Sequence, residues 1–254
     1  IINLTQHYFF VINITSNLQL NIKLAGKESF RLLFGFSIWI FLSKSFSFIF
    51  YKIDTIIIGM FLPPINLTYY SIASKIYEVL KYGFSLLSST LVPVTSEVAA
   101  LRDREKLSLL FQKASRYTVI LMYPILCFVF YYVGDIIKLW VGNGFDASIL
   151  LARVMIVSLF FVALFSCGAE MVVGLNKVKM LLKYNGIASI INLVISIILV
   201  QRIGVYGVVI GTLIGTIIIS IGYISKMLHE FSYSVTNFLR HIVLAPLLLT
   251  AVLF

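Results

Sequence analysis

Long apolar segments alternate with short polar ones along the chain. Seven of these segments are long enough to cross a bilayer, since about 20 apolar residues span the hydrocarbon core. Inside a bilayer every backbone N–H and C=O group needs a partner within the protein, so such segments form helices. The pattern therefore predicts an all-α fold, a polytopic transmembrane helix bundle. The predicted spans are Leu32–Met60, Leu67–Val94, Tyr117–Lys138, Ile149–Val173, Leu181–Val200, Val205–Lys226 and a segment from Asn237 to the chain end.

Polar residues interrupt the first two spans at helical spacing. Residues three, four or seven positions apart share one face of a helix, so each span carries one polar stripe. Two polar stripes on consecutive spans are too costly to face lipid, so we expect them to face each other or a water-filled cavity. The first stripe contains Ser37, Lys44, Ser47, Tyr51 and Asp54, and the second contains Ser71, Ser74, Lys75, Glu78, Lys81, Tyr82, Ser85 and Ser88.

Depth along these two helices predicts which charges pair. Asp54 and Lys75 both lie roughly 12–14 Å from the turn between the spans, at about 1.5 Å per residue. They are therefore candidates for a structural ion pair, and Lys52 and Glu78 match in depth nearly as well. A role for Asp54 or Glu78 in proton transfer is the alternative, and it would require a carboxyl group whose pKa is raised by burial.

The remaining lysines of the hairpin have no carboxylate at their depth. Lys44 and Lys81 lie deeper than the acidic residues, and an unpaired cation inside a membrane needs an anion or water. This favours a cationic cavity wall that faces an anionic substrate. The candidate cavity residues are Lys44, Lys52, Lys81, Ser47, Tyr51, Ser74 and Ser85.

Two further segments have patterns that bear on packing. Residues 96–116 place apolar side chains among charges and predict an amphipathic helix at the membrane surface. Gly207, Gly211 and Gly215 recur every fourth residue in the sixth span. Small residues at this spacing let a neighbouring helix approach closely, which indicates a packed bundle.

The composition agrees with a membrane protein and its charge indicates an orientation. The 254 residues are 60% hydrophobic and 12% charged, with a formal net charge of +10. The basic residues lie in short loops, so nucleic acid is not a predicted partner. Thirteen lysines and arginines flank the spans on one side and only Lys138 and Arg202 flank them on the other. Since cytoplasmic loops carry the excess of basic residues, residues 1–31 are predicted to be cytoplasmic.

No catalytic, metal or cofactor constellation is visible in the sequence. Cys127 and Cys167 lie inside apolar segments without metal-ligand spacing, and His7, His229 and His241 are scattered. We therefore expect a protein that is not an enzyme, with no metal and no cofactor.

Five segments resemble, in order, the second half of bacterial polysaccharide or O-antigen flippases. These belong to the multidrug/oligosaccharidyl-lipid/polysaccharide exporter superfamily. The resemblance covers roughly residues 30–226 and includes Asp54, Gly59 and Tyr70-Ser71-Ile72-Ala73. The segments are "IDTIIIGMFLPPINLTYYSIASKIYE", "LVPVTSE", "LWVGNGF", "GLNKVKM" and "NLVISIILVQRIGVYGVVIGTLIG".

The resemblance implies one lobe of a two-lobed exporter in the bacterial inner membrane. Residues 1–31 would be the linker between lobes, 32–226 a six-helix lobe, and 237–254 the start of a further helix. The chain would then be a fragment that lacks the first lobe. The implied substrate is an undecaprenyl-diphosphate-linked oligosaccharide, flipped from the inner to the outer leaflet for surface polysaccharide biosynthesis. Membrane lipids and a polysaccharide polymerase machinery are the implied partners.

Two other functions remain open on the sequence alone. An ion-coupled multidrug exporter of the same fold would favour a carboxylate-rich cavity, whereas the hairpin has four lysines and two carboxylates. A membrane-embedded polysaccharide polymerase would need a sizeable external loop with catalytic residues, and the predicted external loops are short. A purely structural membrane subunit is a further alternative.

Overall fold

The computed structural model describes residues 26–231, 233–244 and 246–247. Within helices it leaves out the side chains at positions 27–29, 32, 33, 36 and 51. The chain divides into two compact units, residues 1–38 and 39–254. Most of the predicted linker 1–31 lies outside the described residues. The second unit contains the candidate site.

The described residues are helical and contain no strand, which confirms the predicted fold class. The helices are α2 (Lys27–Phe61), α3 (Pro64–Ser89), α4 (Leu91–Ala100), α5 (Arg104–Val141), α6 (Asp146–Gly174), α7 (Val178–Ile203), α8 (Val205–Glu230), α9 (Val235–Phe238) and a π-helical turn (Leu239–Leu244).

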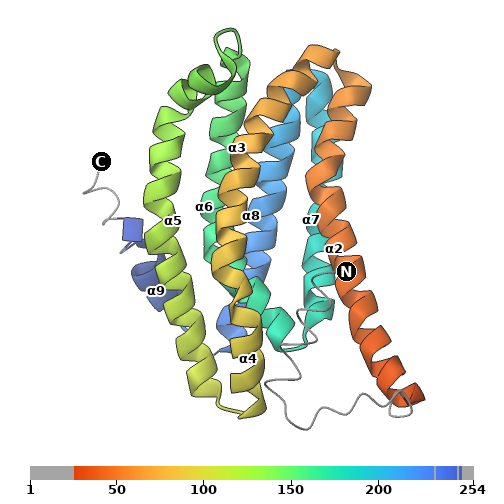
Figure 1. Cartoon of the computed structure of the whole chain (residues 1–254), viewed down its shortest axis with the longest axis vertical. Coiled ribbons are helices and arrows are strands. Elements are labelled where there is room, and N and C mark those ends of the chain that lie inside the picture. Colours follow the sequence, from red (N-terminus) through yellow and green to blue (C-terminus); the bar gives the residue numbers. More distant parts are fainter. Residues whose placement is uncertain (1–25, 232, 245, 248–254) are drawn as a thin grey trace, which may run out of the picture. The chain divides into compact units, whose positions relative to one another are not determined.

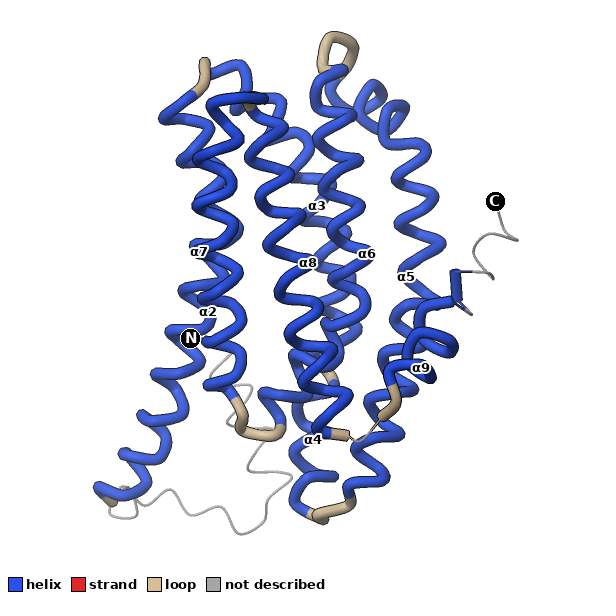
Figure 2. The backbone as a smooth tube through the Cα atoms, turned by 180° about the vertical axis from the view of Figure 1, so that it is seen from behind, coloured by secondary structure: helices blue, strands red, loops and turns tan. Residues whose placement is uncertain are grey.

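Helix α6 lies at the centre of the second unit. It packs against α3, α4, α5 and α8, while α7 packs against α8. Its side chains Leu151, Ala152, Ile156, Leu159 and Ala163 have no exposed surface. Figures 1 and 2 show these long helices side by side from opposite directions. An apolar centre of this kind positions the more polar α3 beside it.

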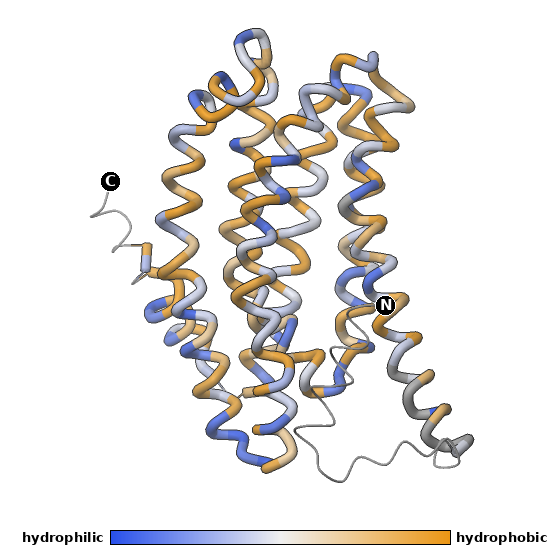
Figure 3. The backbone as a smooth tube through the Cα atoms, viewed as in Figure 1, coloured by the Kyte–Doolittle hydropathy of each residue, from blue (hydrophilic) through white to orange (hydrophobic). Residues whose placement is uncertain are grey.

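The helix ends alternate between the two ends of the second unit. The α2–α3, α5–α6 and α7–α8 turns lie at one end, and the α4–α5 and α6–α7 turns lie at the other (Figure 1). In Figure 3 hydrophilic residues gather at the α4–α5 turn and interrupt α3. Consecutive helices that each cross a bilayer must have their connecting turns on alternate sides, so this arrangement agrees with the predicted spans.

The predicted amphipathic helix over residues 96–116 is wrong in its bounds. Residues 96–100 belong to α4, a turn follows, and the remainder is the beginning of α5. The break has a local cause. Arg102 adopts a positive φ of 56°, and the Asp103 side chain caps α5 by accepting from the backbone N–H of Lys106 at 2.9 Å. This backbone hydrogen bond also holds the pKa of Asp103 below its ordinary value.

Four helices, α5, α6, α7 and α8, are long and apolar enough to cross a membrane. The other predicted spans stay predictions. Helix α2 includes undescribed side chains, and the predicted second span is divided between α3 and α4. The described part of the predicted last helix corresponds to α9 and the π-helical turn. Residues 248–254 of that prediction lie outside the described residues.

Candidate functional site

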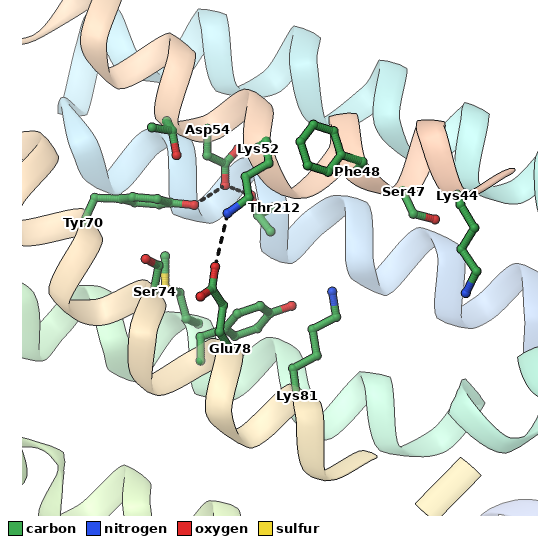
Figure 4. Close-up of a pocket in the computed structure, with 13 residues that line it drawn as sticks. Lys44, Ser47, Phe48, Lys52, Asp54, Tyr70, Ser74, Glu78, Lys81 and Thr212 are labelled. Atoms are coloured by element: carbon green, nitrogen blue, oxygen red, sulfur yellow. Dashed lines mark hydrogen bonds and ion pairs between the residues drawn. The ribbon is translucent and has the colours of Figure 1, made fainter. Parts of the chain in front are cut away.

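A cavity of about 360 Å³ opens between α2 and α3, with α6 and α8 behind it. Figure 4 shows the side chains of these helices pointing into it. Its size is at the low end of the range of small-molecule sites, roughly 300–1,000 Å³. The residues that line it are Lys44, Ser47, Phe48, Lys52, Asp54, Thr55, Tyr70, Ser74, Tyr77, Glu78, Lys81, Met155 and Thr212.

One face of α2 forms its share of the cavity wall. Lys44, Phe48, Lys52 and Thr55 follow each other at spacings of four, four and three residues. Residues at these spacings lie on the same side of an α-helix. The predicted polar stripe of α2 is therefore partly a cavity wall.

The adjacent face of α2 packs on α7 and α8 instead. The Asn185 amide nitrogen of α7 donates to Ser43 Oγ at 3.2 Å and to Ser47 Oγ at 3.0 Å. Ser189 Oγ of α7 lies 3.2 Å from the Phe46 carbonyl, to which it donates. These hydrogen bonds hold α2 at one rotation about its axis, and this rotation turns the lysines toward the cavity.

Three charged side chains form an exposed cluster across α2 and α3. Lys52 Nζ lies 3.3 Å from Glu78 Oε1, and Lys75 Nζ lies 3.0 Å from Glu78 Oε2. The predicted pairing of Lys52 with Glu78 is confirmed. Glu78 thus forms ion pairs with both Lys52 and Lys75. Neither of these lysines pairs with Asp54.

The predicted ion pair between Asp54 and Lys75 is wrong. Asp54 is 1% exposed and accepts hydrogen bonds from Thr212 Oγ1 at 2.5 Å and from Tyr70 Oη at 3.2 Å. Matching depth was not sufficient, because Asp54 lies on the α2 face that packs on α8. Lys75 lies on an exposed face of α3, where it pairs with Glu78.

The two deeper lysines lie at one end of the cavity. Lys81 Nζ is 6.0 Å from the centroid of the Tyr77 ring, a distance at which a cation still interacts with an aromatic face. Among the described residues Lys44 takes part in no ion pair. It also lines a neighbouring cavity of about 110 Å³, together with Glu170. Both lysines lie farther from the α2–α3 turn than Lys52 and Glu78 (Figure 4).

Of the serines predicted to line the cavity, two do so and one does not. Ser47 and Ser74 line the cavity as expected. Ser85 is exposed on α3 and is not part of the described lining. The side chain of Tyr51 lies outside the described residues.

Sequence reasoning missed the contributions of α6 and α8, which are Met155 and Thr212. Thr212 lies beside Gly211 in a stretch whose small residues indicate only close helix packing. A signal was present on α7, where Ser189, Asn192 and Ser196 recur at spacings of three and four. A polar stripe within an apolar span indicates partners on a neighbouring helix.

The exposed charge cluster is expected to contribute little to stability. The Lys52 and Glu78 side chains are 52% and 44% exposed, and exposed ion pairs contribute about 0–1 kcal/mol. We therefore expect Glu78→Gln to lower the melting temperature of the purified protein by less than about 4 °C. Ser85→Ala, an exposed change on the same helix, is the control. A loss several times larger for Glu78→Gln alone would show that Glu78 organises the hairpin.

The comparisons with known proteins identify the family. A model of the family described as polysaccharide biosynthesis protein matches residues 1–150, which is more than half of the chain. The matched part contains α2, α3 and α4 and the whole of α5. No curated protein and no solved structure matches the chain. The chain belongs to the polysaccharide biosynthesis protein family, and together with its four membrane-spanning-capable helices this makes it a membrane protein of polysaccharide biosynthesis.

Proposed function

We propose that this protein flips an undecaprenyl-diphosphate-linked oligosaccharide from the inner to the outer leaflet. The observation that carries the proposal is the cavity between α2 and α3, whose wall contains Lys44, Lys52 and Lys81. The cavity lining contains these three cations but only two carboxylates. One of the two, Asp54, is buried and accepts a hydrogen bond from Thr212. A cavity with this excess of positive charge suits an anionic headgroup.

The cavity residues suit the two chemical parts of such a substrate. Lysine ammonium groups bind phosphate oxygens through charge-assisted hydrogen bonds, so Lys44 and Lys81 would hold the diphosphate. The hydroxyl groups of Ser47, Thr55 and Ser74 would hydrogen-bond sugar hydroxyls. The aromatic ring of Tyr77 offers an apolar face beside them.

The charge distribution supports a specific orientation. Arg102, Arg104 and Lys106 lie at the α4–α5 turn, and Lys177 and Lys179 lie at the α6–α7 turn, which is at the same end of the second unit. Because basic loops stay in the cytoplasm, this end would face the cytoplasm of a bacterium and residues 1–31 would be cytoplasmic. Residues 32–226 would form one lobe of a two-lobed transporter, followed by a further helix over 237–254. The oligosaccharide would pass to a polysaccharide polymerase outside.

A multidrug exporter with the same helices is less compatible with the cavity. Many drug cations would need an exposed carboxylate, and Glu78 already lies within 3.3 Å of two lysines. A polymerase would instead join repeat units that have already reached the outer leaflet. These alternatives predict different intermediates in the cell.

The test is deletion of the full-length gene in its host, followed by complementation. We expect surface polysaccharide to disappear and single lipid-linked repeat units to accumulate in the inner leaflet. There they are inaccessible to a glycosidase that cannot cross the membrane. Expression of the full-length gene should restore both measurements.

Other outcomes would contradict the flippase proposal in distinct ways. Normal surface polysaccharide in the deletion strain would remove a role in translocation. Single repeat units that reach the outer leaflet but stay unjoined would indicate a polymerase. A strain that lacks the enzyme for the first sugar transfer is the control, because it makes no lipid-linked unit at all.

A further inference from the structure

A larger cavity, of about 870 Å³, lies where α5 begins and α8 ends. This is the end of the second unit opposite the α2–α3 turn (Figure 1). We call it the α5–α8 cavity. It shares no lining residue with the cavity between α2 and α3. The residues that line it are Arg104, Ser225, Leu228, His229, Glu230, Tyr233, Ser234 and Val235.

An aromatic stack fixes the helices around the α5–α8 cavity. The buried Phe111 ring of α5 lies 5.4 Å from the Phe231 ring at the end of α8 and 6.3 Å from the Phe238 ring of α9, measured between centroids. Ser108 Oγ of α5 donates to the Phe231 carbonyl at 3.3 Å. Three elements are thus held together, so the cavity is already formed without a ligand.

The wall of the α5–α8 cavity contains three hydroxyl groups. The backbone N–H of Tyr233 donates to the Leu228 carbonyl at 2.9 Å, so the chain turns back directly after α8. This turn brings Tyr233 and Ser234 into the same lining as Ser225 of α8. Each hydroxyl can donate one hydrogen bond to an oxygen atom of a ligand.

Positive charge exceeds negative charge at this cavity. Glu230 is the one carboxylate among the described lining residues, and it forms an ion pair with Lys177 of α7. Lys226 and Arg104 also attract the Glu230 carboxylate, although neither forms an ion pair in the described part of the chain. One carboxylate thus faces three cations, and two positive charges remain for a ligand.

The acidic neighbours of Arg104 in the sequence do not neutralise it. The Asp103 side chain caps α5 and lies 2.9 Å from Lys106 Nζ, while Glu105 is exposed and belongs to no described cavity lining. Arg104 also lines an adjacent cavity of about 280 Å³ together with Arg102. A guanidinium group binds phosphate through two parallel hydrogen bonds, so this arrangement suits a phosphate ligand.

The level of the α5–α8 cavity corresponds to that of lipid headgroups. Helix α8 has 26 residues and is therefore about 39 Å long, close to the roughly 40–45 Å of a bilayer with its headgroups. Since α8 begins at one surface of the membrane, it ends at the headgroups of the other. Val235, Leu239 and Leu244 are exposed on α9 and the π-helical turn, where they can contact acyl chains.

We propose that the α5–α8 cavity binds the headgroup of an acidic phospholipid, with Arg104 and Lys226 at its phosphate and the hydroxyls of Ser225 and Ser234 beside it. Such a lipid would connect α5, α8 and the beginning of α9 and stabilise their packing. In the orientation proposed above it would belong to the cytoplasmic leaflet. The site does not depend on the transport function, because it is separate from the cavity between α2 and α3.

The experiment is a melting curve of the purified full-length protein in detergent micelles with increasing phosphatidylglycerol. Phosphatidylcholine at the same mole fraction supplies a phosphate without net negative charge. We expect phosphatidylglycerol to raise the melting temperature in a saturable way, by roughly 3–8 °C at about 100 times its apparent Kd, and phosphatidylcholine to have little effect. Inorganic phosphate should not reproduce the shift, because it lacks the acyl chains.

Three variants test the residues of the site. Arg104→Gln should weaken the apparent affinity for phosphatidylglycerol about tenfold or more, since it removes a charge-assisted hydrogen bond. Glu230→Gln removes the one carboxylate of the described lining and should strengthen the affinity. Arg202→Gln is the matched control, because Arg202 is exposed at the opposite end of the second unit, beside the α7–α8 turn. It should respond like the unmodified protein.

Several results would overturn the lipid site. These are equal shifts with the two phospholipids, an unchanged affinity in Arg104→Gln, and an equal loss in Arg202→Gln, which would indicate overall charge. A full shift with inorganic phosphate would assign the cavity to a soluble anion. Displacement of phosphatidylglycerol by an equimolar polyprenyl diphosphate would assign it to the transported lipid. If Arg104→Gln does not fold, Lys226→Gln and the direction of the Glu230→Gln effect decide the question.

Discussion

Replacing both Lys44 and Lys81 by alanine is expected to abolish surface polysaccharide in the complemented deletion strain, while the protein still inserts at normal abundance. Both lysines line the cavity at the end away from the α2–α3 turn. A hydrogen bond to a charged group contributes about 1.5–3 kcal/mol, so each lysine would account for roughly ten- to hundredfold in affinity for a diphosphate. Loss of both should leave the headgroup without a binding site.

Stability should not account for this defect. Lys44 is exposed and Lys81 is only partly buried, and neither belongs to the apolar core around α6. Each single variant should therefore lower the amount of surface polysaccharide with little change in the amount of protein in the membrane. Lys44→Arg and Lys81→Arg should retain most activity, because arginine keeps the charge and binds phosphate well.

Lys113→Ala is the control for this prediction. Lys113 is exposed on α5, away from the described cavity lining, and its replacement removes the same charge. Normal surface polysaccharide from the double variant at equal membrane abundance would contradict the proposed role of the two lysines. An equal loss from Lys113→Ala would assign the effect to overall charge.

Gly207→Ala is expected to destabilise the α7–α8 hairpin. A Cβ atom at Gly207 would collide with the backbone carbonyl group and the side chain of Leu199 on α7. Backbone atoms of a packed helix have little room to move, and overpacking costs about 1–3 kcal/mol. We expect the melting temperature to fall by roughly 5 °C. The same hairpin holds Asn192 and Thr212, so its displacement would also disturb the surroundings of Asp54.

Gly186→Ala on α7 is the matched control, because its Cβ atom would meet nothing within 4 Å. Alanine is a better helix former than glycine by up to about 1 kcal/mol, so this variant should be as stable as the unmodified protein or slightly more stable. The same substitution on the two helices should thus have opposite effects. Equal melting temperatures for the two variants would show that α7 and α8 do not pack as closely as Gly207 indicates.

Within the α2–α3 hairpin, helix periodicity and depth predicted one charge pair correctly and another one wrongly. They predicted that Lys52 and Glu78 lie close together, and they do. They also paired Asp54 with Lys75, and this pairing is wrong. Both predictions used depth along the helix, but depth does not determine the rotation of a helix toward a third neighbour. Asp54 faces Thr212, which is 158 positions away in the chain.

The sequence by itself determined the class of protein, the long helices α5 to α8 and the end of the bundle at which each turn lies. These follow from local properties, namely the length of apolar segments, their helical period and the sign of loop charges. Family membership also follows from the sequence. Tertiary structure alone decided which polar face of α2 lines a cavity and which packs on α7 and α8. The reason is physical: the rotation of α2 depends on distant hydrogen bonds, such as those of Asn185 with Ser43 and Ser47.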